Sequence, residues 1–272
     1  MASKIKKVLQ GEAARVTWID YSAYAATIFN LNTDSWANSA TITSAMSQSY
    51  SLIRPDVVTL SLTNIFFPDI LRPVGSLDAM STSLEDGDKI KMLVDTIEGL
   101  SYSLGGEADL VLSLPTPSAA MELSGLRKEL CDDFSSLDLL GTSYCDLFRQ
   151  VSELGVEGIV LRHTRDNGVI SEDERDAMEP VLSLSKYYGW TLAVSFERSP
   201  CPSEGQDFGD IALFPNVGPE ILESSTVGFV FGGGLTAPFW YGEQPPPRVG
   251  ICFGNIPPDA EPEVVLERCE LL

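Results

Sequence analysis

The fold is decided by the stretch DVVTLSLTNIFFPDILRPVGSL, residues 56–77. Residues 57–62 form a short apolar run rich in β-branched side chains, which predicts a strand buried on both faces. The run breaks at Asn64, and Asp69 follows two phenylalanines and a proline. In α/β enzymes the chemistry lies just beyond the carboxyl ends of such strands. Asp69 is therefore a candidate catalytic acid. The alternative is that it caps the helical turn that begins at Ile70.

Short apolar runs alternate with helical stretches along the whole chain. The predicted strands are residues 16–20, 57–62, 109–114, 158–161, 191–196, 210–214, 227–231 and 248–253. The predicted helices are residues 36–53, 85–104, 121–154 with a division at Gly141, 171–188, and a short one from Pro262. Eight buried strands with intervening helices predict an α/β fold, a single (β/α)8 TIM-type barrel domain over residues 1–272.

The outer ring of helices is predicted to be incomplete near the C-terminus. Only residues 219–225 separate the sixth predicted strand from the seventh, and residues 232–247 are rich in glycine, proline and aromatic residues. We interpret Gly232–Gly234 as a loop after the seventh strand, either a flexible turn or a place where backbone amides approach an anion. Exposed apolar strand surface needs a cover, so we expect a homodimer or a hetero-oligomer with a related barrel subunit.

The charge and the cysteines restrict the partners and the compartment. The net charge of −21 makes nucleic acid and anionic membrane surfaces poor partners, because a polyanion is repelled at long range. The five cysteines are scattered without a CxxC pair, which favours a reducing compartment. No apolar segment of signal-peptide or membrane-spanning length is found. We expect a cytoplasmic protein.

Closure of the barrel would gather polar side chains at the carboxyl ends of the strands. The arginines among these side chains can bind a substrate carboxylate bidentately. The alternative is that they neutralise neighbouring acids such as Asp166. The single histidine, His163, is a candidate catalytic acid or base, or else an ordinary loop residue. No metal-site spacing links it to Cys201 or Cys252, so we predict no metal and no cofactor. The candidate substrate-binding residues are Asp20, Tyr21, Asn64, Arg72, Arg162, Arg165, Glu197, Arg198 and Asn255.

Two segments resemble known enzymes. NIFFPDILRPVGSL, residues 64–77, resembles the uroporphyrinogen decarboxylase motif in which F-S-D-I-L follows the second barrel strand, and FGNIPPDAEPEVV, residues 253–265, is similar to that family's closing segment. KVLQGEAARV, residues 7–16, resembles the opening shared with the related corrinoid-linked methyltransferases. The resemblance implies a divergent, shortened member of this superfamily in which Asp69 matches the catalytic aspartate.

The chain also departs from both families. The arginine-rich opening of the decarboxylases corresponds here to WIDYSAYAA, residues 18–26, which has no arginine. The family's tyrosine falls near Met121 and its histidine at Gly254. The zinc-binding His-x-Cys of the methyltransferases corresponds to Ser-Phe-Glu at residues 195–197. A polycarboxylate tetrapyrrole needs several arginines and zinc needs soft ligands, so the sequence predicts neither parent activity unchanged.

Three functions follow as hypotheses. The first is a decarboxylase-like lyase that acts on a small carboxylate-bearing molecule by metal-free acid/base chemistry. In it Asp69 is catalytic, His163 assists proton transfer, and Arg162, Arg165 and Arg198 hold the substrate. The second is a methyltransferase with a corrinoid or folate partner. The third is a non-catalytic binding or assembly subunit of a barrel enzyme.

Overall fold

Eight parallel strands close into a barrel in sequence order, and β8 pairs with β1 to complete the ring. The computed structural model describes residues 3–32, 35–67, 76–165 and 168–272. The strands are β1 (Val16–Asp20), β2 (Val57–Ser61), β3 (Asp109–Pro115), β4 (Val156–His163), β5 (Thr191–Phe196), β6 (Ile211–Phe214), β7 (Phe231–Gly234) and β8 (Ile251–Asn255). The predicted TIM-type α/β barrel is confirmed.

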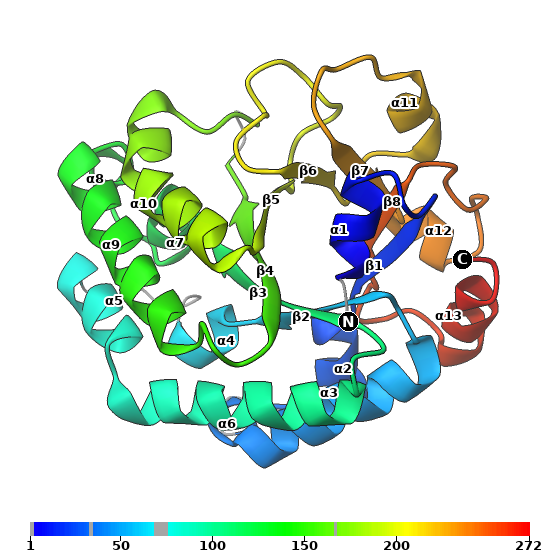
Figure 1. The fold of residues 1–272 in the computed structure, drawn as a ribbon, viewed down its shortest axis with the longest axis horizontal. Helices are drawn as coiled ribbons and strands as arrows, with labels where there is room; N and C mark the ends of the chain where they lie inside the picture. Colours follow the sequence, from blue (N-terminus) through cyan, green and yellow to red (C-terminus); the bar gives the residue numbers. More distant parts are fainter. Residues whose placement is uncertain (1–2, 33–34, 68–75, 166–167) are drawn as a thin grey trace.

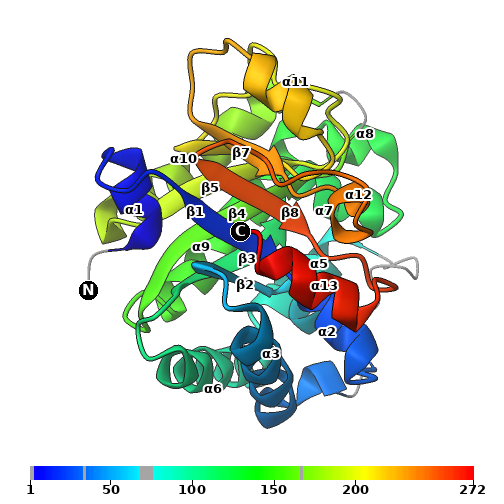
Figure 2. The ribbon, with the colours of Figure 1, turned by 90° about the vertical axis from the view of Figure 1, so that its right-hand side faces the viewer.

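Helices surround the barrel unevenly (Figures 1 and 2). Long helices cover the side formed by the first five strands: α3 (Ser39–Ile53), α6 (Gly87–Leu104), α9 (Phe134–Gln150) and α10 (Glu172–Tyr188). In the last third, residues 197–210 contain no helix, and the next two crossovers contain only α11 (Pro219–Ser224) and α12 (Ala237–Trp240). The predicted incomplete ring is thus confirmed.

Shorter helices complete the chain. They are α1 (Lys4–Leu9), α2 (Ser22–Ile28), the 3-10 turn η1 (Ser35–Ala37), α4 (Thr63–Phe66), α5 (Leu77–Leu84), α7 (Pro117–Leu123), α8 (Lys128–Cys131) and α13 (Pro262–Cys269). No helix in the described ranges combines the length and the apolar character needed to cross a lipid bilayer.

The barrel interior changes from apolar to polar along its axis. At the amino-terminal end α1 inserts Ile5, which is fully buried, and the Asp109 carboxylate accepts hydrogen bonds from the Ser3 hydroxyl (2.7 Å) and the Ile5 amide (2.9 Å). In the middle Trp18 donates to the Thr59 hydroxyl at 2.9 Å and packs edge-on against Phe253. These contacts fill the amino-terminal end and the middle of the barrel interior.

The uppermost inward positions are polar. Because side chains alternate between the two faces of a strand, the positions two residues beyond the apolar middle layer also point inward. These positions are Asp20, Ser61, Ser113, Arg162, Ser195 and Asn255. Strand register makes neighbours of Asp20 and Asn255, and of Arg162 and Ser195. A polar layer therefore forms the floor of the carboxyl-terminal mouth.

The predicted position of the seventh strand was wrong, and so was the interpretation of its glycines as a loop. The strand is Phe231–Gly234, whereas the apolar run 227–230 precedes it. A Cβ on Gly232 would lie 2.5 Å from Ile251 Cγ2, and one on Gly233 would lie 2.5 Å from the Phe214 carbonyl oxygen. Only glycine fits between β6 and β8 at this spacing, so the strand does not carry the expected apolar signature.

The predicted division of the long helical tract at Gly141 was also wrong. Breaks occur earlier, between α7, α8 and α9, and α9 continues through residue 141. A Cβ on Gly141 would overlap the Ala177 carbonyl oxygen on α10. The glycine therefore allows close packing of two helices and does not end one.

We expect Gly141→Ala to lower the free energy of unfolding by about 1–3 kcal/mol, because the added methyl group meets backbone that cannot move alone. The matched control is Gly87→Ala, since a Cβ there has nothing within 4 Å and alanine is the better helix former. Urea denaturation of both variants measures the difference. Equal stability of the two would contradict this account of the α9–α10 contact.

Candidate functional site

A cavity of about 480 Å³ opens at the carboxyl-terminal mouth of the barrel, where barrel enzymes place their active sites. Its volume is within the range of small-molecule sites. The lining residues come from the ends of strands and from the loops that follow them. They are Asp20, Ser22, Ala23, Ser61, Thr63, Asn64, Pro115, Leu123, Arg162, Thr164, Pro215, Asn216, Ala237, Asn255, Ile256, Pro257 and Pro258.

Arg162 lies between two carboxylates on the floor of this cavity. Its Nε is 3.1 Å from Glu197 Oε1, and its Nη1 is 3.6 Å from Asp20 Oδ2. Both acids have further partners: Ser195 Oγ donates to Glu197 Oε1 at 2.9 Å, and the Ser22 amide donates to Asp20 Oδ1 at 2.9 Å. We call Arg162, Asp20 and Glu197 the mouth triad.

The mouth triad is mostly removed from water and carries one positive and two negative charges. The exposed fractions of its side chains are 29% for Arg162, 8% for Asp20 and 14% for Glu197. Burial alone would lower the pKa of Arg162, but Glu197 and Asp20 outweigh burial, so the pKa is raised above its ordinary value. The guanidinium therefore stays protonated, and the triad has a net charge of −1.

Asparagine side chains supply further polar groups at the mouth. Asn255 Oδ1 is buried and has no hydrogen-bond partner in the described part of the chain, and its residue is the register neighbour of Asp20. Asn216 donates its side-chain amide to the Glu197 carbonyl oxygen at 2.7 Å, and Asn64 is exposed at the cavity rim. A buried acceptor without a partner beside a cavity is a position for a ligand's hydrogen-bond donor.

Tyr21 and His163 are buried but do not line the cavity. Each directly follows an inward-pointing residue, Asp20 or Arg162, and so lies on the opposite face of the chain. The Tyr21 hydroxyl donates to the Met46 carbonyl oxygen on α3 at 3.2 Å, and burial raises its pKa. His163 Nδ1 lies 3.5 Å from the Thr116 hydroxyl, and its ring packs edge-on against Phe196.

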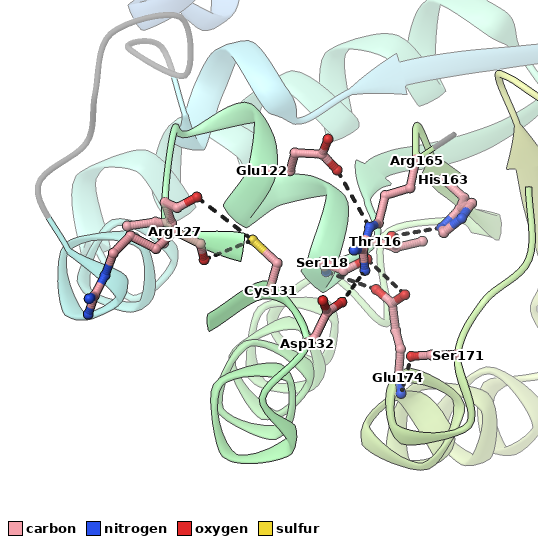
Figure 3. A network of polar contacts seen from close by, with 11 residues as sticks. Thr116, Ser118, Glu122, Arg127, Cys131, Asp132, His163, Arg165, Ser171 and Glu174 are labelled. Carbon is pink, nitrogen blue, oxygen red and sulfur yellow. Dashed lines mark hydrogen bonds and ion pairs between the residues drawn. The ribbon is translucent and has the colours of Figure 1, made fainter. Parts of the chain in front are cut away.

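Arg165 belongs to a polar network outside the cavity, between β4 and the helices α7, α8 and α10 (Figure 3). Its Nη1 is 2.7 Å from Asp132 Oδ1 and its Nε is 3.5 Å from Glu122 Oε2. Burial lowers its pKa, but Asp132 and Glu122 raise it by more.

The same network contains a buried carboxylate. Glu174 of α10 accepts from the amide and the hydroxyl of Ser118 on α7, each at 2.8 Å. These bonds, with the Arg165 ion pairs, tie the ends of three helices together.

The structure brings together only part of the residue set predicted from the sequence. Asp20, Asn64, Arg162 and Asn255 line the cavity, and Glu197 joins them through Arg162. Arg198 is exposed and does not line it. Asp69 and Arg72 lie in residues 68–75, outside the described residues. Ser22, Ser61, Thr63 and Thr164 also line the cavity but were not predicted. The alternation within the strands could have identified Ser61.

The residues at the mouth do not match a zinc site. Within the described ranges no group of three or more His, Cys, Asp or Glu side chains is arranged to hold a metal ion. Residues 195–197, at the position of the methyltransferase His-x-Cys, supply one carboxylate and no soft ligand. His163, the single histidine, does not line the cavity.

Comparison with known proteins relates the chain to others through its fold alone. No protein-family model and no curated protein sequence matches it. Among solved structures, a methyltransferase from Methanosarcina mazei is similar with a TM-score of 0.65 and 11% identity over 98% of this chain and 97% of that one. The homocysteine methyltransferase MmuM from Escherichia coli is similar with a TM-score of 0.39 and 9% identity over 98% and 99%. This chain shares its barrel, over nearly the full length, with the first of these proteins.

Replacing the central cation tests whether the mouth triad is one electrostatic unit. We expect Arg162→Gln to lower the free energy of unfolding by about 2–3 kcal/mol at pH 7, because two buried carboxylates lose their counter-charge. The control is Arg149→Gln, whose ion pair with Asp146 is exposed and should change stability by less than about 0.5 kcal/mol. Urea denaturation measures both. A loss for Arg162→Gln no larger than the control's would contradict the interpretation.

Proposed function

We propose that the chain is a methyltransferase-like enzyme that binds a small polar molecule at the barrel mouth and methylates it, with a corrinoid or folate partner as the methyl source. Two observations support the proposal. The barrel is similar over nearly its full length to a methyltransferase. A cavity of suitable volume is lined by Asp20 and Arg162, and Glu197 pairs with Arg162 beside it; this mouth triad is the observation that carries the assignment of the site.

The mouth triad suits the acceptor's half of the reaction. In methyl transfer the methyl group leaves its donor without the bonding electron pair, and the acceptor atom forms the new bond with a lone pair. A thiol, hydroxyl or ammonium acceptor must also lose a proton, which the carboxylate of Asp20, a lining residue, can take. Arg162 fixes the two carboxylates and stabilises negative charge that develops on the acceptor.

A zinc ion is one way to activate such an acceptor, and the resemblance to corrinoid-linked methyltransferases implies one. The residues described at the mouth do not fit a zinc site, as shown above. We therefore derive no step through a metal and assign the activation of the acceptor to the mouth triad.

The proposal predicts methylation of a small acceptor. We would incubate the protein with methylcobalamin or 5-methyltetrahydrofolate and a panel of small thiols, amines and alcohols, and detect methylated products by mass spectrometry. Asp20→Asn should slow the reaction by about 10²-fold or more, because a proton acceptor is lost. Asp146→Asn, far from the cavity, is the control. Failure to methylate any acceptor, or full activity of Asp20→Asn, would count against the proposal.

A decarboxylase-like lyase is the second candidate. Asn64 lies at the cavity rim, and α4, which contains it, leads toward the segment that carries Asp69. In this hypothesis the bond to a substrate carboxyl group breaks, carbon dioxide leaves, and the remaining carbon receives a proton from Asp69. Arg162 would hold the substrate; Arg165, Arg198 and His163, which the sequence also assigns to this role, do not line the cavity. The third hypothesis, a non-catalytic subunit, stays a prediction, as do the oligomeric state and the cytoplasmic location.

The lyase hypothesis predicts that Asp69→Asn slows carbon dioxide release by about 10²–10⁴-fold, because asparagine cannot donate the proton. Release from a panel of small carboxylic acids can be followed with a coupled carbon dioxide assay. Asp78→Asn, on exposed α5, is the control. Unchanged turnover in Asp69→Asn would remove this mechanism.

A further inference from the structure

We propose that Asp20 and Glu197 determine which substrate charge the barrel mouth accepts. By neutralising Arg162 they make the mouth select a neutral or cationic molecule that donates hydrogen bonds, and disfavour carboxylates and phosphates. The inference rests on the proposed function in one respect, that the substrate occupies this cavity.

The charges at the cavity carry the first step. Arg162 is the only cationic side chain among the described residues that line it. Its Nε and Nη1 already face Glu197 and Asp20, so an incoming carboxylate would compete with two acids for the same guanidinium. Both acids are largely buried, so water screens them little and they repel an anion at close range.

The hydrogen-bonding groups of the wall carry the second step. Pro115, Pro215, Pro257 and Pro258 line the cavity, and proline has no backbone N–H. The carbonyls of Pro115 and Pro257 already accept hydrogen bonds, from the Tyr144 hydroxyl and the Ala260 amide. Asn255 Oδ1 is a buried acceptor with no partner among the described residues. Anion sites are built from backbone N–H groups and free cationic side chains. The described wall instead lacks a backbone N–H at its four prolines and offers the Asn255 acceptor, which suits a ligand with N–H or O–H donors.

A second arginine held by two acids provides a matched comparison. Arg165 pairs with Glu122 and Asp132 outside the cavity. The double variants Asp20→Asn with Glu197→Gln, and Glu122→Gln with Asp132→Asn, change the net charge equally. Only the first releases an arginine inside the mouth.

The test uses benzoate, benzamide and benzamidinium, which share shape and differ in charge. Their dissociation constants for the full chain are measured by isothermal titration calorimetry. We expect wild type to bind benzamidinium and benzamide about tenfold or more tightly than benzoate. The Asp20→Asn/Glu197→Gln variant should bind benzoate more tightly than benzamidinium, whereas the Glu122→Gln/Asp132→Asn variant should keep the wild-type order.

Several outcomes would overturn the inference. They are tightest binding of benzoate by wild type, undetectable or equal binding of all three probes, and an unchanged order in the Asp20→Asn/Glu197→Gln variant. If that variant does not fold, as judged by circular dichroism, the inference is tested by the order of probe affinities in wild type and in the single variant Glu197→Gln. No methyl donor is involved, so the binding order and the methylation assay can fail independently.

Discussion

Closure of the parallel sheet is the constraint on which the rest of this structure depends. Once eight strands form a ring, their inward side chains share one narrow volume and cannot be chosen independently. Ile5, Trp18 and Phe253 fill the amino-terminal and middle parts of the barrel interior. The polar layer is therefore confined to the carboxyl-terminal mouth. Asp20 and Arg162 come from distant parts of the sequence, and closure alone brings them within 3.6 Å.

Closure also explains the glycines of the last third of the chain. β6 and β7 are each only four residues long, and neighbouring side chains and backbone approach the β7 glycines closely. Gly232 and Gly233 permit this against Ile251 and Phe214, and Gly254 permits it against the Leu235 carbonyl. The short crossovers in this region leave little room for helices. An incomplete outer ring and a glycine-rich strand are therefore two results of the same compact geometry.

The sequence predicts the barrel because buried parallel strands give continuous apolar runs, and seven of the eight strands have one at nearly the observed position. β7 does not, because steric fit at Gly232 and Gly233 outweighs strand propensity. The site is harder to predict. The predicted fourth strand, residues 158–161, ends before Arg162 and His163, and the alternation that sends one inward and the other outward applies only once both belong to β4.

Whether an arginine near a site can bind an anion depends on the acidic side chains that already pair with it. In a chain with 39 acidic and 18 basic residues, acids outnumber the basic side chains that could pair with them, so a position after a strand is weak evidence for anion binding. Arg162 and Arg165 are each paired with two acids, but their surroundings differ. Glu122 and Asp132 are about half exposed, at 51% and 49%, and water screens them. Asp20 is buried and Glu197 is only 14% exposed, so their charge acts on whatever enters the cavity. Burial of the partners, more than the arginine itself, sets the electrostatic character of the mouth.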